Sequence, residues 1–109
     1  MANTNSLIGT PINLNELITY QPGSVVSRTL LDKKVGTLTL FAFGEDQGLS
    51  EHTAPYDATI QILDGSADIT IAGTVQRLTT GQLIIMPANI PHSVRAVGQF
   101  KMLLIMIRE

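Results

Sequence analysis

Any imidazole chemistry in this chain must use His52 or His92, because the 109 residues contain no other histidine. Imidazole binds divalent metals and titrates near neutral pH, which also suits it to proton transfer. His92 alternates in phase with Val94 and Ala96, which predicts an inward side chain and, taken alone, favours a core histidine. His52 falls in an expected polar loop over residues 48–57, which alone favours a solvated surface group.

The spacing of each histidine from nearby glycines changes this interpretation. His52 stands thirteen positions before Gly65. His92 stands eleven positions after Gly81, with Pro87 between them.

These spacings resemble the two motifs of the cupin superfamily, over about residues 48–96. The first cupin motif contains a His-x-His pair, a glutamate and a closing glycine. His52 and Gly65 match the first histidine and the closing glycine. Ala54 and Ala58 stand where the second histidine and the glutamate would be.

The second cupin motif contains a glycine, a proline, another glycine, a histidine and an asparagine. Gly81, Pro87 and His92 match it at the proper spacing. Asn89 replaces the second glycine, and asparagine also tolerates left-handed backbone geometry. Ala96 replaces the asparagine. The two motifs together identify the chain as resembling a small single-domain cupin.

The resemblance implies an iron, manganese, nickel or zinc ion held by three histidines and a glutamate. Of those four positions the chain keeps His52 and His92. Two imidazoles bind a divalent metal if water or nearby side chains complete the coordination shell. The polar side chains closest in sequence for that purpose are Gln47, Glu51, Asp57 and Gln61. Strand alternation places the last two out of phase with the inward face.

Apolar residues are expected to surround the two imidazoles. The predicted pocket residues are Tyr56, Ala58, Ile60 and Met86. Alanine in place of two polar ligands lowers the charge of the site and enlarges its free volume. The sequence therefore favours a small, mostly apolar ligand, with or without a weakly held divalent metal and water.

Three functions fit these residues. The first is a small-molecule-binding protein in which the histidines orient the ligand. The alternative is a metal-dependent cupin enzyme of the dioxygenase or isomerase type, acting on a small organic substrate. The third is a structural dimer whose pocket has no ligand. The sequence leaves catalysis open, because a barrel of this kind hosts many unrelated functions.

The elements that must position the site are strands, because apolar residues recur with a period of two after residue 24. Turn residues separate the runs, and the expected strands lie near 24–31, 35–43, 58–63, 66–72, 75–79, 82–86, 92–97 and 100–107. The chain has no room for the long crossover helices of a parallel sheet. The sequence predicts an all-β fold, which the resemblance specifies as an antiparallel jelly-roll barrel with the interior residues Ile60, Ile62, Ile69, Ile71, His92 and Val94.

The N-terminal part is expected to differ from the rest. Residues 1–11 are predicted to be a flexible N-terminus and residues 12–109 a single cupin barrel domain. A short helix over 13–18 would be capped by an asparagine and would end before Pro22. Such a helix is too short to be stable alone, so its apolar residues must pack on the barrel.

The expected strands 37–43 and 100–107 are apolar on both faces. In the second strand, Leu103, Ile105 and Ile107 lie opposite Met102, Leu104 and Met106. A strand of this type must be covered on both sides. We expect a homodimer that buries the outer face of one of these strands, either 37–43 or 100–107, where the outer face of the latter would carry Met102, Leu104 and Met106. The alternative is that Leu14, Leu17 and Ile18 cover that face within one chain.

Composition excludes several classes of protein. The chain is 44% hydrophobic, which excludes intrinsic disorder, and its net charge of −2 gives no basic surface for nucleic acid or anionic membranes. It has no cysteine, hence no disulfide or thiolate site. Residues 1–6 lack the basic start of a signal peptide, and the longest apolar run, 102–107, is far shorter than a membrane span. We expect a cytoplasmic protein.

Overall fold

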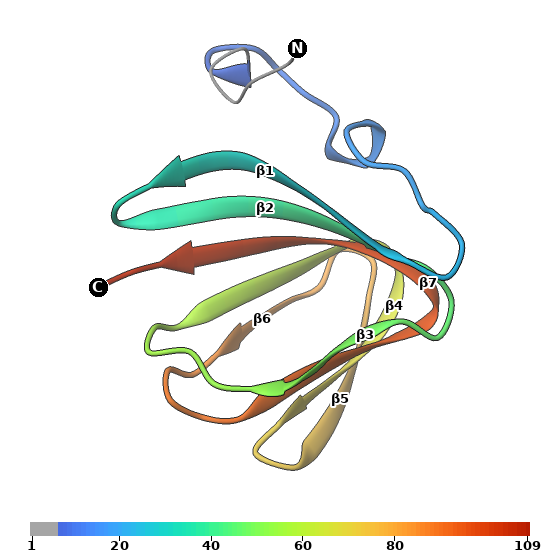
Figure 1. The fold of residues 1–109 in the computed structure, drawn as a ribbon, viewed down its shortest axis with the longest axis vertical. Coiled ribbons are helices and arrows are strands. Elements are labelled where there is room, and N and C mark those ends of the chain that lie inside the picture. Colours follow the sequence, from blue (N-terminus) through green and yellow to red (C-terminus); the bar gives the residue numbers. More distant parts are fainter. Residues whose placement is uncertain (1–6) are drawn as a thin grey trace.

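Seven antiparallel strands form a barrel over residues 7–109, the part of the chain that the computed structural model describes (Figure 1). The strands are β1 (Val25–Lys33), β2 (Gly36–Phe43), β3 (Gly48–His52), β4 (Ala58–Ile71), β5 (Thr74–Thr79), β6 (Leu83–Met86) and β7 (His92–Ile107). They pair in the order β1-β2-β7-β4-β5, while β3 pairs with β7 and β6 with β4. This confirms the predicted all-β antiparallel barrel. No helix in this part of the chain has the length and apolar character needed to cross a membrane.

The two longest strands, β4 and β7, pair along most of their lengths. Each of them joins two strands that the sequence predicted separately. The pairing register shifts near the middle of both strands, where β-bulges bend them instead of ending them. One continuous pair of strands therefore contributes to both ends of the barrel.

Gly65 lies within β4, beside the two extra residues of β7, and not in the turn predicted at residues 64–65. Its φ of 78° is in the left-handed region, where a residue without a Cβ atom is not strained. A Cβ atom here would collide with the carbonyl oxygen of Gln99 and lie 3.0 Å from the Cα of Phe100. Gly81, with φ of 90°, does occupy the turn predicted for it.

The core fills the inside of the barrel with apolar side chains from every strand, and β1 and β3 contribute one half-buried residue each, Val25 and Leu49. The predicted interior residues all face inward, and Ile71 alone among the apolar ones is only partly buried. Phe43 and Phe100 stack with their ring centroids 4.4 Å apart and their planes at 7°. Both rings are fully buried, so they close the interior on the side of the bulges.

The predicted N-terminal helix is wrong, because the segment forms only a single 3-10 turn, η2 (Leu14–Glu16). The side chain of Asn13 makes no capping bond to the backbone and instead donates to the Glu16 carboxylate at 3.3 Å. Without a cap, so short a segment cannot sustain an α-helix. Part of the predicted flexible N-terminus, residues 1–6, lies outside the described residues, while Leu7 packs against a hydrophobic cluster of the barrel.

The N-terminal segment nevertheless covers part of the outer face of the sheet, as the alternative prediction proposed. Leu14, Leu17 and Ile18 belong to the same hydrophobic cluster as Leu40 of β2 and Leu103 of β7. The Lys101 ammonium group donates to the carbonyl of Asn15 at 2.7 Å, and the Tyr20 hydroxyl donates to the Asp64 carboxylate at 2.5 Å. These contacts attach the segment to one end of the β7 surface.

The faces of the second half of β7, residues 100–107, are the reverse of those we predicted. Met102, Leu104 and Met106 point into the barrel, where they line a cavity or pack against the core. The outer face carries Leu103, Ile105 and Ile107. The reason is that even-numbered residues face inward from His92 onward, and the two extra residues at the β7 bulge preserve that phase.

The close approach of Gln99 to Gly65 can be tested by substitution. Gly65→Ala should lower the free energy of unfolding by about 1–3 kcal/mol, since it adds both left-handed strain and a backbone collision. Gly98→Ala is the matched control: Gly98 has φ of 72°, but a Cβ atom there meets nothing within 4 Å. Urea denaturation should show a clearly larger loss for the first variant. Equal losses would mean that the approach of Gln99 has no energetic consequence.

Candidate functional site

His52 lies at the end of a strand that the sequence analysis took for part of a loop. β3 pairs with β7 through Gly48 with Arg95 and Leu49 with Val94, and the register then shifts so that His52 pairs with His92. The sequence of β3 lacks the apolar alternation from which the other strands were predicted. The edge pairing with β7 is what brings the two histidines together.

His92 is the first residue of β7 and lies between β3 and β4, where its other neighbour is Ile71. It is 3% exposed, as its predicted inward orientation requires. The loop before it is joined to the loop after His52, because the backbone N–H of Asn89 donates to the carbonyl of Ala54 at 2.7 Å. Asn89 has φ of 64°, the left-handed geometry expected at the position of the second motif glycine.

The two imidazoles meet edge to face, with their Nε2 atoms 3.2 Å apart and their ring centroids 4.4 Å apart. The Nδ1 atom of His52 lies 2.7 Å from the carbonyl oxygen of Ser50, and that of His92 lies 3.2 Å from the carbonyl oxygen of Ile90. A carbonyl oxygen only accepts hydrogen bonds, so each Nδ1 carries a proton and donates it. If both rings are neutral, both Nε2 atoms are acceptors at this distance, so the pair needs a proton, a hydrogen-bond donor or a cation.

Burial favours the neutral form of His92. It lowers the pKa of this imidazole below its ordinary value, against the opposing effect of the hydrogen bond to Ile90, and the neighbouring His52 ring lowers it further. A buried imidazole loses hydration that stabilises its charged form. His92 therefore presents an acceptor nitrogen toward the cavity at neutral pH.

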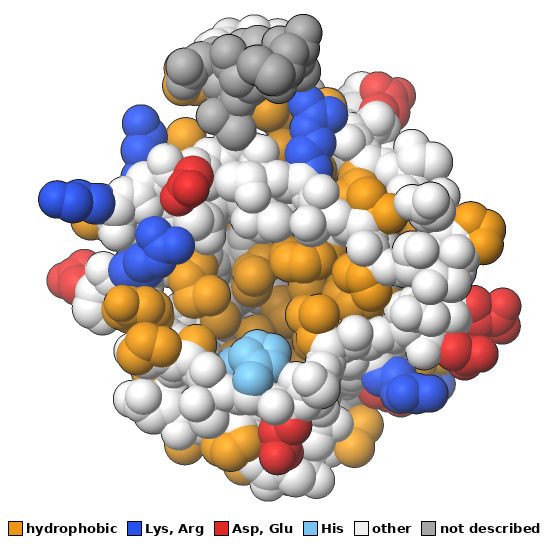
Figure 2. All heavy atoms as spheres, in the orientation of Figure 1, with side chains coloured by type: hydrophobic (Ala, Val, Ile, Leu, Met, Phe, Trp, Pro, Cys, Tyr) orange, Lys and Arg blue, Asp and Glu red, His pale blue; other side chains and the backbone are white. Residues whose placement is uncertain are grey.

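Beside the pair is a cavity of about 100 Å³. Apart from the two imidazoles it is lined by aliphatic and thioether side chains, from Leu49, Ala54, Ala58, Ile60, Met86, Val94, Met102, Leu104 and Met106. Figure 2 shows an apolar hollow in the face of the molecule with an imidazole at its rim. A few polar groups at the edge of an apolar cavity are typical of a small-molecule site.

The structure places three of the predicted pocket residues, Ala58, Ile60 and Met86, at this cavity. Tyr56 lies elsewhere, in a groove on the outside of the barrel with Thr59 and Ile85. The difference arises because Tyr56 precedes β4 and so is not subject to the alternation of that strand.

Three lining residues, Leu49, Leu104 and Met106, were not predicted to face the cavity. For the two in β7 the signal was present: counting every second residue from His92 without interruption leads to both of them. For Leu49 there was no signal, because β3 has no alternating pattern.

The cupin family's sequence model, described as a cupin domain, matches residues 38–108. This chain belongs to the cupins. The match runs from within β2 to the end of β7. It includes both histidines and the whole cavity lining. A search among curated proteins found no match.

Solved structures of other cupin-like proteins share the fold of this cupin. A conserved protein of unknown function from Streptococcus pyogenes is 35% identical, with a TM-score of 0.88 over 93% of this chain and 89% of that one. A cupin superfamily protein from Desulfitobacterium hafniense is 29% identical, with a TM-score of 0.88 over 93% of both chains. A cupin 2 conserved barrel domain protein from Leptotrichia buccalis is 37% identical, with a TM-score of 0.86 over 89% of this chain and 47% of that one.

The metal ligands that the cupin motif implies can be compared with the donor atoms present in this cupin. The Nε2 atoms of His52 and His92 converge, and a backbone carbonyl holds each opposite ring nitrogen, as is usual for metal-ligating imidazoles. Ala54 and Ala58 line the same cavity but have no donor atom. Residues 7–109 contain no group of three or more histidine, cysteine, aspartate or glutamate side chains that could hold a metal ion. The residues thus fit an ion held at two positions and not the four-ligand set.

None of the polar side chains considered for completing the shell lines the cavity. The carboxylate of Asp57 accepts the backbone N–H of Ala88 at 2.8 Å, and Gln61 is out of phase with the inward residues of β4, as predicted. Any further nitrogen or oxygen ligands to an ion at the pair would have to come from water or from a bound molecule.

The lowered pKa of His92 predicts the direction of the pH dependence of stability. The unfolded chain binds a proton at His92 more readily than the folded chain does, so stability is at its full value above about pH 6.5 and declines below it. His92→Gln removes this contribution. Urea denaturation between pH 7.5 and 5.5 should therefore give a flatter pH dependence for the variant than for the natural protein. Parallel curves would contradict the assignment.

Proposed function

We propose that this cupin binds a small organic molecule, whose apolar part fills the cavity and whose polar group lies at the His52–His92 pair. The observation that carries this proposal is the convergence of two Nε2 atoms at the edge of an otherwise apolar cavity. The apolar lining favours the body of the ligand, and the imidazoles fix its orientation.

The histidine pair favours a ligand that donates a hydrogen bond. Both Nδ1 protons are already used by the carbonyls of Ser50 and Ile90, so the free ring positions are acceptors when the rings are neutral. A hydroxyl, a primary amide or a protonated carboxyl group would satisfy at least one of them. A purely hydrocarbon ligand would leave both acceptors unpaired, which is costly in a desolvated site.

The volume of the cavity limits the part of the ligand that is buried. An apolar cavity of about 150 Å³ accepts benzene, and this one is about 100 Å³. The buried part therefore has fewer heavy atoms than a benzene ring. His52 is exposed, so a larger ligand would extend past it into solvent.

The second candidate is a metal-dependent enzyme of the dioxygenase or isomerase type. The observation in its favour is that both imidazoles are oriented by carbonyls with their Nε2 atoms together. Such a pair would hold zinc, nickel, manganese or iron at two positions only and leave the remaining positions to water or substrate. Ala54 and Ala58 weigh against tight binding of the ion, so we place ligand binding first.

Removing either imidazole tests the ligand proposal. His52→Ala and His92→Ala should each weaken binding of a four-carbon alcohol, amide or carboxylic acid at least tenfold, measured by isothermal titration calorimetry. Tyr56→Phe is the control, because Tyr56 lies in the outer groove and should leave affinity unchanged. Circular dichroism must show that the variants remain folded. Full affinity in both alanine variants would refute the proposal.

Restoring a lost ligand tests the metal alternative. Ala54→His supplies the second histidine of the first motif and should raise the affinity for Zn²⁺ alone at least tenfold if the pair is a reduced metal site. Affinity should fall as the pH drops through the histidine range, because a protonated imidazole cannot coordinate. Unchanged Zn²⁺ affinity in Ala54→His would remove this alternative and leave the ligand proposal standing.

A further inference from the structure

The cavity beside the histidine pair is lined by every methionine of the chain except Met1. Met86 is the last residue of β6, and Met102 and Met106 lie on the inner face of β7. A methionine in a core often serves only to fill space. Here three thioether side chains and two imidazoles line one cavity of about 100 Å³, so soft sulfur ligands lie beside nitrogen ligands.

Two of these methionines flank the position at which the cupin motif has its glutamate. Ala58 stands there, and it pairs with Met86 of β6 on one side and with Met106 of β7 on the other. Directly paired residues of a sheet have Cβ atoms about 4.5–5.5 Å apart, and methionine is long and flexible enough to lean over such a neighbour. Two thioethers therefore reach the place of the missing carboxylate.

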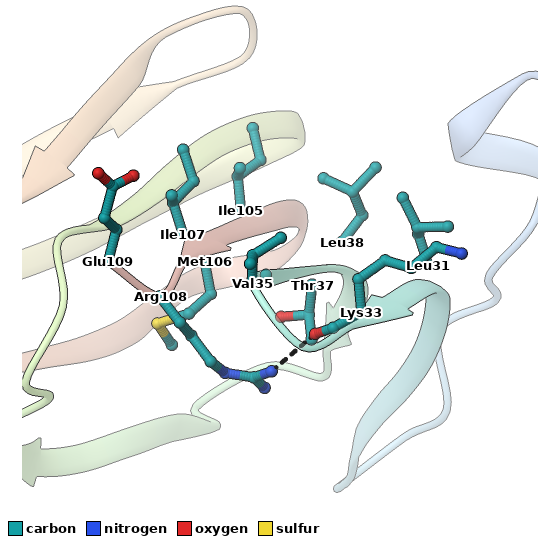
Figure 3. A pocket seen from close by; sticks show the side chains of 11 residues that line it. Leu31, Lys33, Val35, Thr37, Leu38, Ile105, Met106, Ile107, Arg108 and Glu109 are labelled. Atoms are coloured by element: carbon teal, nitrogen blue, oxygen red, sulfur yellow. Dashed lines mark hydrogen bonds between the residues drawn. The ribbon is translucent and has the colours of Figure 1, made fainter.

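Met106 leaves β7 on the side opposite to Ile105 (Figure 3). Ile105 belongs to the outer face, so the thioether of Met106 points into the barrel, as its place in the cavity lining requires. Met86 and His92 are buried, whereas His52 is exposed and Met106 is half-buried. An ion therefore has access from solvent beside His52 and Met106, with buried ligands beyond them.

The two imidazoles are spaced for a shared ion. Zinc–imidazole bonds are about 2.0–2.1 Å long, and bonds of that length from Nε2 atoms 3.2 Å apart would meet at an angle close to the tetrahedral one. A tetrahedral ion has two further positions. Met86 and Met106 would supply one sulfur atom to each, which makes a site of two nitrogen and two sulfur ligands.

All four ligands are uncharged. A thioether carries no charge, and each imidazole donates its Nδ1 proton to a carbonyl, which leaves Nε2 of a neutral ring free to coordinate. Within residues 7–109 no carboxylate side chain lines this cavity. The cost of removing an ion from water rises with the square of its charge, so a neutral site of this kind favours a monovalent ion over a divalent one.

We propose that one Cu(I) ion binds in this cavity, held by two imidazoles and two thioethers. The ligands are His52, His92, Met86 and Met106. Thioether sulfur is a soft ligand that selects Cu(I), and imidazole also suits copper, whereas carboxylate and water suit harder ions such as manganese. This site goes beyond the functions proposed above. The ion and an organic ligand would use the same Nε2 lone pairs, so they would compete for the cavity.

Affinity for Cu(I) alone tests the site. Protein without an affinity tag is titrated in the absence of oxygen with the acetonitrile complex of Cu(I), in competition with a colorimetric chelator, and should bind one ion per chain. Combining Met86→Leu with Met106→Leu should weaken binding about a hundredfold, since leucine has nearly the volume of methionine and no ligand atom. The affinity for Zn²⁺ should stay within about threefold, because zinc would take imidazole and water here.

Met102→Leu is the matched control. Met102 lines the same cavity but pairs with Ile62, two inward positions from Ala58 on β4, so its variant should keep the Cu(I) affinity of the natural protein. Equal weakening by Met102→Leu would overturn the assignment of the two sulfur ligands. Urea denaturation must show that each variant is folded. If the double variant is not, each single leucine variant should weaken binding about tenfold.

X-ray absorption at the copper edge tests the ligands without any substitution. The natural protein should show sulfur as well as nitrogen in the first coordination shell, and the double variant should lose the sulfur. A natural protein that does not bind Cu(I), a shell without sulfur, or undiminished affinity in the folded double variant would overturn the proposal. Each of these results leaves the organic ligand standing, because calorimetry on the metal-free protein tests that ligand separately.

Discussion

The last six residues of β7, 102–107, have no polar face, and most features of this protein follow from that constraint. A strand between two neighbours has to place alternate side chains on opposite sides of the sheet, so apolar residues on both sides need two separate covers. On the inside, Met102, Leu104 and Met106 are covered by the closed barrel and help to form its cavity. On the outside, the N-terminal segment covers Leu103, and Ile107 remains exposed. The cavity and the apolar outer surface are two consequences of one strand.

The histidine pair owes its properties to backbone groups more than to neighbouring side chains. Carbonyl oxygens close to each ring in the sequence hold both Nδ1 protons, and the β3–β7 pairing sets the separation of the Nε2 atoms. The result is two acceptors that face each other beside hydrocarbon. In water, solvent would donate hydrogen bonds to both nitrogens, whereas beside a small apolar cavity two unpaired acceptors are costly, and the proposed ligand site rests on this cost.

Membership of the cupin family establishes the barrel but not the chemistry in it. At the two positions where the cupin motif has a second histidine and a glutamate, this chain has the methyl groups of Ala54 and Ala58. The strands are kept, but these two positions supply no donor atom. Function on a shared fold is decided by a few inward positions, which is why closely similar barrels can differ in what they bind.

The sequence by itself determined the all-β class, the inward phase of the residues around His92 and the two motifs that indicated a cupin. These depend on local alternation and on turn residues, which a linear pattern records. The phase of residues 100–107 was predicted reversed, because the two halves of β7 were taken as separate strands. Only the tertiary structure decided the rest. One extra residue, Leu63, resets the inward phase of β4 from even to odd positions. β3 forms because an edge of β7 is available to pair with it, and the uncapped N-terminal segment lies on the barrel because an apolar face needs cover. Each of these depends on a contact between distant residues, and alternation within a short segment does not encode it.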